Sequence, residues 1–312
     1  MPASRYYLAA FSAFLIWGFF PLPLRQLTAY PSGQILLFRV LLSVGLLVAL
    51  HLLARRGVVR ATIQQWRVAA PTARRRVALG TVVGGILLVG NWLLFIYVIN
   101  QVSVQAGSFA YLICPILLSL LGFVLLRERL RPMQWLAVGL SALSCTLLIS
   151  GDIRSFMMSL LVASTYALYL ISQRGVQGYD RLVLLTVQLL LATVILVPVA
   201  PLLGANLAAG LLDRHLLLFA LVLSVGFTII PLFLNLYALN GLTSGTVGII
   251  MYLNPLVSFG LAFWYFDEHP QPMELLAYAG IVLSIGLYNA RFGRRAAVAA
   301  PPTPPIVAQR GR

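Results

Sequence analysis

Long runs of apolar residues fill the chain, and short polar connectors separate them. A helix that crosses the hydrocarbon core of a bilayer needs about 20 mostly apolar residues. Ten runs reach roughly that length, which predicts an all-α membrane protein with ten transmembrane helices. The runs cover residues 6–24, 34–53, 77–99, 103–126, 133–150, 155–172, 182–203, 215–239, 243–266 and 273–290.

Arginines mark one set of connectors. Short loops that carry positive charge stay on the cytoplasmic side of a membrane. The connector after the second run holds seven arginines, at positions 55, 56, 60, 67, 74, 75 and 76, and is therefore predicted to be cytoplasmic. With ten spans, both termini then fall in the cytoplasm, and the outer loops hold only Arg25, Arg154 and Arg214.

The second half of the chain repeats the first. A shift of 140 positions, without a gap, brings identical residues together across three apolar segments. The pairs are Tyr97 and Tyr237, Asn100 and Asn240, Pro115 and Pro255, Glu128 and Glu268, Pro132 and Pro272, Met133 and Met273, and Ala137 and Ala277. A register shared over this length indicates an internal duplication.

Five spans in each half require the second copy to enter the membrane in the opposite orientation. The connector 127–129, Arg-Glu-Arg, corresponds to Asp-Glu-His at 267–269, so the copy predicted to lie outside lacks the arginines. We therefore predict two inverted five-helix repeats, over residues 1–150 and 151–292, followed by a disordered cytoplasmic tail over 293–312.

Composition excludes several classes of protein. The chain is 61% hydrophobic and 9% charged, unlike a soluble domain. Its net charge of +15 lies in the connectors and is not interleaved with aromatic residues, which argues against nucleic acid as a partner. The histidines are scattered at span ends, and no glycine-rich phosphate loop or nucleophile beside a base is present. We therefore predict no catalytic residue, metal or cofactor.

Arg39 lies inside the second apolar run, and no acidic residue falls within the core of any predicted span. An ionisable residue inside the membrane marks a functional site by default. Its planar guanidinium suits a carboxylate or phosphate on a substrate. A structural role stays open, in which the side chain reaches the outer interface or caps carbonyls of a broken helix.

Polar and aromatic residues of other spans are candidates for the same cavity. Asn91 and Trp92 lie in the middle of the third run, where an amide needs a partner that a neighbouring helix or a ligand supplies equally well. Others lie near the start of the fourth run or beside the prolines of the fourth and ninth. The predicted substrate-binding residues are Arg39, Asn91, Trp92, Gln105, Tyr111, Tyr252 and Asn254.

Pro115 and Pro255 occupy equivalent positions in the two halves. A proline inside a helix leaves the carbonyl one turn earlier without its donor and permits a kink. Paired in this way beside a central cavity, they are predicted to act as hinges. Inherited kinks of purely structural use are the alternative.

The chain resembles the drug/metabolite transporter superfamily, with its two EamA-type repeats, and within it the RarD group of bacterial permeases. The resemblance rests on Trp17-Gly18, Arg39, the block Gly-Asn-Trp-Leu-Leu-Phe at 90–95, Tyr111, Pro115, the block Met-Gln-Trp-Leu-Ala-Val at 133–138, Tyr252 and Pro255. Four positions depart from the group: Gln105 replaces a glutamate, Cys114 an asparagine, Gln34 an acidic residue and Phe38 a histidine.

The resemblance implies a ten-helix transporter of the bacterial inner membrane that moves a small metabolite or drug, usually outward, by alternating access. From Arg39 we expect an amphipathic substrate that carries a carboxylate. A homodimer stays open. Two other classes also stay open, a membrane-embedded enzyme acting on lipid-linked substrates and a membrane partner protein that transports nothing.

Overall fold

The computed structural model describes residues 4–101, 104–147, 153–176, 178–265 and 272–289. Every element in these ranges is helical, as the apolar pattern predicts. The elements are α1 (Ser4–Gly18), α2 (Pro21–Arg25), α3 (Ser32–Leu53), α4 (Arg56–Val68), α5 (Pro71–Gln101), α6 (Val104–Leu126), α7 (Pro132–Leu147), α8 (Ile153–Arg174), α9 (Arg181–Val199), η1 (Ala200–Leu203), α10 (Leu207–Leu211), α11 (Arg214–Ser224), η2 (Val225–Ile229), α12 (Ile230–Ala238), α13 (Ser244–Met251), α14 (Leu253–Trp264) and α15 (Pro272–Asn289).

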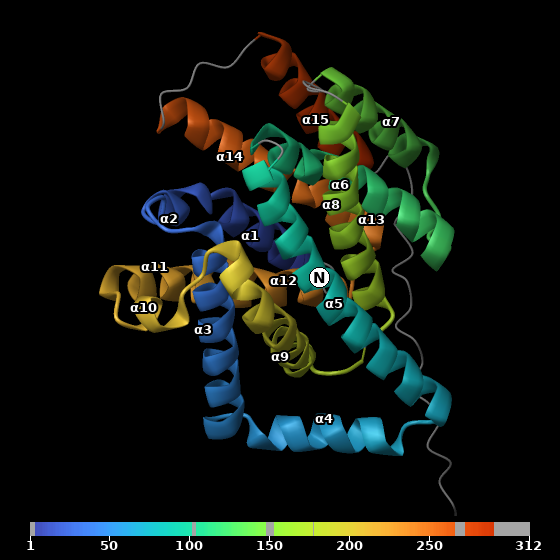
Figure 1. The fold of residues 1–312 in the computed structure, drawn as a ribbon. Coiled ribbons are helices and arrows are strands. Elements are labelled where there is room, and N and C mark those ends of the chain that lie inside the picture. The colour runs from blue at the N-terminus through green and yellow to red at the C-terminus, as the bar shows by residue number, and fades with distance from the viewer. Residues whose placement is uncertain (1–3, 102–103, 148–152, 177, 266–271, 290–312) are drawn as a thin grey trace, which may run out of the picture.

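Helices from the two halves of the chain are interleaved (Figure 1). In the first half, α1 packs against α12, α13 and α14, and α3 packs against α9 and α11. Both α5 and α6 pack against α8, while α7 pairs with α15. Side chains from both halves therefore meet at the centre of one bundle.

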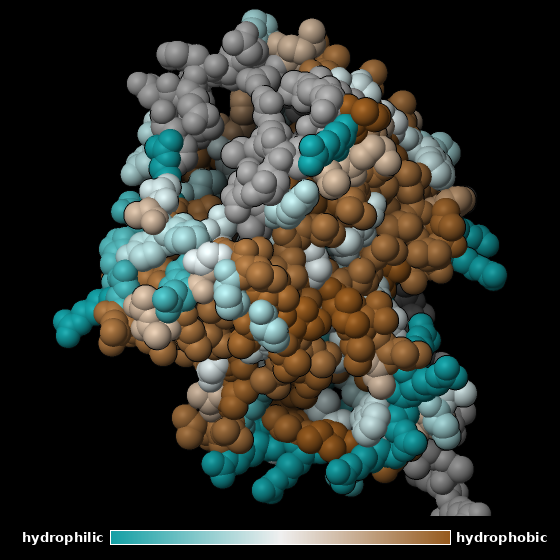
Figure 2. Space-filling view, viewed as in Figure 1, coloured by the Kyte–Doolittle hydropathy of each residue, from teal (hydrophilic) through white to brown (hydrophobic). Residues whose placement is uncertain are grey.

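Seven helical segments of the described chain are long and apolar enough to cross a membrane: Ser4–Arg25, Ser32–Leu53, Pro71–Phe95, Phe156–Arg174, Arg181–Leu203, Arg214–Ala238 and Ser244–Leu261. Two shorter apolar helices cover Ala110–Leu126 and Leu275–Asn289. Broad apolar areas lie on the outside of the bundle (Figure 2), as expected for a surface that faces lipid. The chain is thus a multi-pass membrane protein, and the count of ten spans stays a prediction.

Prolines accompany breaks in several of the predicted spans. In the first predicted span, α1 ends at Gly18 and α2 begins at Pro21. In the eighth, Pro231 follows the π-helical turn η2. In the ninth, the helix is interrupted at Tyr252, three residues before Pro255. A proline supplies no N–H to the carbonyl four residues earlier, so the regular ladder fails at these points. Pro115, by contrast, lies within α6, which runs without a break.

The arginine-rich connector contains a helix. It was not predicted, because the prediction counted only long apolar runs. Helix α4 crosses one end of the bundle and joins α3 to α5 (Figure 1). Val59, Thr62 and Trp66 recur at helical spacing and form its less exposed face. We call the end of the bundle that carries α4, with the seven arginines between positions 55 and 76, the arginine-rich end.

Candidate substrate cavity

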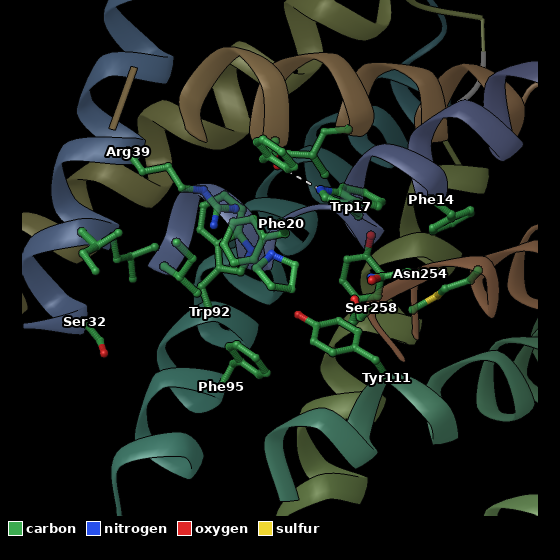
Figure 3. A pocket seen from close by; sticks show the side chains of 18 residues that line it. Phe14, Trp17, Phe20, Ser32, Arg39, Trp92, Phe95, Tyr111, Asn254 and Ser258 are labelled. Carbon is green, nitrogen blue, oxygen red and sulfur yellow. Dashed lines mark hydrogen bonds between the residues drawn. The ribbon is translucent and has the colours of Figure 1, made fainter. Parts of the chain in front are cut away.

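A cavity of about 440 Å³ lies between helices of both halves (Figure 3). Cavities of this size hold small organic molecules. Its walls are mainly aromatic and aliphatic, with a few polar side chains. The lining residues are Phe14, Trp17, Phe20, Pro21, Leu24, Ser32, Ile35, Leu36, Arg39, Trp92, Phe95, Tyr111, Tyr166, Phe227, Leu232, Met251, Asn254 and Ser258.

The cavity is displaced away from the arginine-rich end. Helix α4 joins the C-terminal end of α3 to the N-terminal end of α5. The lining residues come from the opposite parts of these two helices: Ser32, Ile35 and Arg39 from the first turns of α3, and Trp92 and Phe95 from the C-terminal part of α5. A molecule in the cavity would therefore lie nearer the other face of the membrane.

Arg39 projects from α3 into this cavity (Figure 3). Its Nε donates a hydrogen bond to Thr228 Oγ1 at 2.7 Å. Its guanidinium carbon lies 5.0 Å from the centre of the Trp92 ring and 5.4 Å from that of Phe20, within the range of cation–π attraction. Within the described residues no carboxylate pairs with Arg39, and both salt bridges lie elsewhere.

The π-helical turn η2 presents Thr228 to Arg39. A π-turn inserts one extra residue into a helix and often occurs at a functional site. The Thr228 hydroxyl donates to the Leu223 carbonyl at 3.0 Å while it accepts from Arg39. Ser224, just before the turn, donates its hydroxyl to the Arg39 carbonyl at 2.8 Å. The backbone and side chain of Arg39 are thus both fixed by the same segment of the second half.

The same turn organises an aromatic wall. Pro231 has no N–H to offer to the Phe227 carbonyl four residues earlier, and this carbonyl accepts a hydrogen bond from Trp17 Nε1 at 2.9 Å. The Phe227 ring packs edge-on against Phe20, with centroids 5.8 Å apart. A side chain of α1 therefore satisfies a carbonyl that the irregular helix leaves free.

Tyr111 of α6 forms part of another wall, and its hydroxyl points into the cavity (Figure 3). Its ring packs edge-on against Phe95 at 5.3 Å and Tyr166 at 6.3 Å between centroids. The Tyr166 hydroxyl accepts a long hydrogen bond from Asn235 Nδ2 at 3.4 Å. These contacts hold the ring of Tyr111 in place and leave its polar end toward the cavity.

Asn254 and Ser258 line the cavity from α14, directly after the interruption at Tyr252. The Ser258 hydroxyl donates to the carbonyl of Gly18, the last residue of α1, at 3.0 Å. A side chain on Gly18 would overlap Val257, so glycine is what allows α1 to approach α14 this closely.

The structure brings four of the predicted substrate-binding residues to this cavity: Arg39, Trp92, Tyr111 and Asn254. Asn91 is instead buried between α5 and α8, where its amide donates to the Val162 carbonyl at 2.9 Å and to Thr165 Oγ1 at 3.1 Å. Of the two partners that the sequence allowed for the Asn91 amide, a neighbouring helix or a ligand, the structure shows the neighbouring helix.

Tyr252 also lies outside the cavity lining. Its side chain is fully buried in a cluster with Cys145, Ile281 and Tyr288, beside α7 and α15. The side chain of Gln105 lies outside the described part of the structure. The two predicted hinges lie within α6, for Pro115, and in the first turn of α14, for Pro255.

Sequence reasoning missed the contributions of Phe20, Phe227, Thr228 and Ser258. Trp17 entered only through the family resemblance. One sequence signal was available for the segment around Phe227, namely Pro231 inside the eighth apolar run, because an intrahelical proline predicts a disturbed ladder with free carbonyls.

The arginine-rich end is closed by contacts of Glu128 with the second half and by contacts within the second half. Glu128, after α6, accepts from the backbone N–H of Ser244 at 2.9 Å and pairs with Arg174 Nη2 at 3.3 Å. Arg174 Nη1 donates to the Leu239 carbonyl at 2.5 Å, and Arg181 of α9 donates through Nε to Asn240 Oδ1 at 3.0 Å. These contacts join the ends of α6, α8 and α12 to the starts of α9 and α13.

A second ion pair ties α4 to the same region. Arg55 Nη2 lies 2.8 Å from Asp180 Oδ2, and the Asp180 side chain also accepts from the N–H groups of Leu182 and Val183 at the start of α9. Burial raises the pKa of Asp180, but the hydrogen bonds from Arg55 and from these backbone groups outweigh it and hold the pKa below its ordinary value.

Comparison with known proteins matches this architecture. A solved crystal structure has a similar fold, with a TM-score of 0.69, 20% sequence identity and coverage of 91% of this chain and 97% of that one. Protein RarD of Salmonella typhi is 30% identical over 90% of this chain and 93% of its own length. Protein RarD of Streptomyces exfoliatus is 32% identical over 95% and 93%.

An uncharacterised transporter of Pseudomonas aeruginosa is 31% identical over 91% of this chain and 93% of its own length. The model of the EamA-like transporter family matches twice, at residues 4–150 and 153–290. These two matches leave little of the chain outside the family. The chain is therefore a membrane transporter of the EamA-like family, similar to RarD.

Proposed function

We propose that the protein exports a small amphipathic molecule that carries a carboxylate, by alternating access across the inner membrane. The observation that carries this proposal is Arg39, a guanidinium that lines an aromatic cavity and pairs with no carboxylate of the described chain. A charge held inside a membrane protein is strongly stabilised by an opposite charge. A substrate carboxylate would supply it.

Arg39 retains donors for such a group. Its Nε is occupied by Thr228, which leaves the two terminal nitrogens for a ligand. A carboxylate accepts two parallel N–H bonds from a guanidinium, an arrangement that selects a planar anion over a neutral amide. Trp92, Phe95 and Tyr111 provide apolar walls for the rest of the molecule.

Alternating access requires the cavity to be closed on one side at a time. Arginine placement assigns the arginine-rich end to the cytoplasm. The Glu128 contacts hold that end together, while the cavity lies in the other half of the bundle. We therefore assign this conformation to an outward-facing state, and the inward-facing state would break the Glu128 contacts.

The two prolines support a hinge role in this cycle. Tyr111 and Met251 lie four residues before Pro115 and Pro255, respectively, and both line the cavity. Each therefore has a carbonyl that receives no helical N–H. Motion at these two equivalent points would change the shape of the cavity directly. The two family matches likewise support repeats over residues 1–150 and 151–292.

The carboxylate can be tested with a matched pair of ligands, phenylacetate and its neutral amide phenylacetamide. A ligand that binds the folded protein raises its melting temperature. We expect the acid to stabilise the purified protein more than the amide does. Arg39→Gln should weaken binding of the acid by roughly 10- to 100-fold, because a hydrogen bond to a charged group contributes about 1.5–3 kcal/mol.

Arg39→Lys keeps the charge but loses the planar pair of N–H donors. Its affinity for the acid should therefore fall between those of the wild type and Arg39→Gln. Arg154→Gln removes an exposed arginine and is the matched control. If phenylacetate and phenylacetamide raise the melting temperature equally, and Arg39→Gln does not change this, the proposal of a carboxylate-bearing substrate is contradicted. Flux of a labelled ligand in vesicles of both orientations then tests export. A chemically altered product would favour a membrane enzyme, and absence of both flux and stabilisation would favour a partner protein.

A further inference from the structure

We propose that helix α4 is a binding surface for anionic phospholipid headgroups. The relevant side chains are Arg56, Arg60 and Arg67. Their spacings of four, seven and eleven residues are close to whole helical turns, so they lie on one face of α4. All three side chains are exposed. We call this face the basic stripe.

A separate face of α4 is anchored to the protein, which fixes the direction of the basic stripe. Thr62 is buried, and Trp66 packs against the cluster formed by Val77, Val176 and Leu184. The side-chain amide of Gln65 donates to the Gly178 carbonyl at 3.2 Å. Together with the Arg55–Asp180 ion pair, these contacts hold α4 across the end of the bundle with its arginines turned away from the core.

Helix α4 lies at the depth of the membrane interface. It begins three residues after Leu53, the last residue of the apolar helix α3, and Leu53 is 81% exposed. On either side of the basic stripe lie Ile63 and Val68, which are 44% and 77% exposed. A helix that combines arginines with exposed apolar side chains and lies across the bundle axis has the form of an interfacial helix.

Charge determines the partner. The segment 54–76 contains seven arginines and no acidic residue, and hydrophilic side chains gather at this end of the molecule (Figure 2). The guanidinium group binds phosphate oxygens through two donors. Because the stripe begins three residues after Leu53, the exposed last residue of the apolar helix α3, the negative partner that fits it is a bilayer headgroup, such as that of phosphatidylglycerol, rather than a soluble anion.

The test compares two double variants of the full-length protein. Arg60→Gln/Arg67→Gln removes two charges of the basic stripe, whereas Arg129→Gln/Arg131→Gln removes two exposed charges after α6. Native mass spectrometry in neutral mixed micelles gives the affinity for added phosphatidylglycerol and phosphatidylcholine. We expect the stripe variant to bind phosphatidylglycerol about 30-fold more weakly, at roughly fivefold per arginine near an anionic surface, and the control to resemble the wild type.

Arg60→Lys/Arg67→Lys retains both charges and is expected to keep most of the affinity. It also serves if the glutamine variant fails to fold. Unchanged phosphatidylglycerol binding in the glutamine stripe variant would overturn the proposal. So would an equal loss in both glutamine variants, or a wild type that does not distinguish the two lipids. None of these outcomes depends on a transport substrate, so the result is independent of the proposed function.

Discussion

The carboxylate of Glu128 accepts a hydrogen bond from the backbone N–H of Ser244 at 2.9 Å, which joins the end of α6 to the first turn of α13. The Gly245 N–H approaches the second oxygen at 3.4 Å, and Arg174 pairs with the first. A negative charge at a helix N-terminus is favourable because the first N–H groups have no partner within the helix. One side chain thus holds together three helices that the sequence places in different halves.

Replacing Glu128 by Gln should loosen this closed end. The variant keeps the size of the side chain but loses the charge that attracts both Arg174 and the start of α13. We expect the amides of the first turn of α13 to exchange with solvent about tenfold faster, which corresponds to a loss of about 1.4 kcal/mol from charged hydrogen bonds.

Hydrogen exchange measured by mass spectrometry on peptides that contain Ser244 and Gly245 provides this readout. Asp180→Asn is the control, because it disrupts the Arg55 ion pair without touching α13. Exchange in α13 that is equal in the wild type and in Glu128→Gln would show that Glu128 does not hold this end closed.

Trp92→Leu should weaken binding of an aromatic carboxylate. The Trp92 ring lies under the Arg39 guanidinium and forms part of the cavity wall. Its removal takes an aromatic wall from the ligand, a contact that contributes about 0.5–1.5 kcal/mol, or roughly 2- to 10-fold in affinity for phenylacetate. Trp135→Leu is the matched control, since Trp135 is 40% exposed on α7. Similar affinities in both variants would remove Trp92 from the site.

The candidate site could be predicted in part because hydrocarbon penalises polar groups. Arg39 and Asn254 are conspicuous inside apolar runs, and the structure places both on one cavity. The same reasoning also selected Asn91, whose amide is satisfied by a carbonyl of α8. Sequence gives the depth of a residue in the membrane, but only packing determines whether a neighbouring helix or the cavity receives it.

Departures from regular helix were harder to predict. Tyr252 was selected because it lies near Pro255, yet the interruption between α13 and α14 turns it toward α7 and α15. Thr228 was not selected because a threonine in an apolar run looks ordinary, and only the extra residue of the π-turn brings it to Arg39. Helix α4 was not predicted because its apolar residues are separated by polar ones and form no long apolar run.

Gly18→Ala should destabilise the protein by about 1–3 kcal/mol, the usual cost of overpacking. The added methyl would overlap the β-branched side chain of Val257, which has little rotamer freedom to move aside. Gly45→Ala is the control, because no atom lies within 4 Å of a methyl added there. Thermal unfolding in one detergent compares the two, and equal melting temperatures would show that α1 and α14 can separate at no cost.

Stability should depend on pH through Asp180. Its folded pKa lies below the unfolded value of about 3.9, so the carboxylate stabilises the fold fully above that pH and ceases to do so as the pH falls through the folded pKa. Asp180→Asn lacks this contribution at every pH. The difference in unfolding free energy between the wild type and this variant should be constant above about pH 5 and shrink below about pH 4.

This difference in unfolding free energy should be about 0.5–1 kcal/mol at neutral pH. The ion pair contributes no more because the side chains of Arg55 and Asp180 are 24% and 26% exposed to solvent. Arg55→Gln removes the strongest of the interactions that lower the Asp180 pKa, so it should move the onset of the acid-induced loss to higher pH. Melting curves of the three proteins between neutral pH and about pH 3 measure both effects. A difference that stays constant down to the lowest pH would mean that folding does not lower the Asp180 pKa, and that the ion pair with Arg55 does not stabilise the contacts around α4.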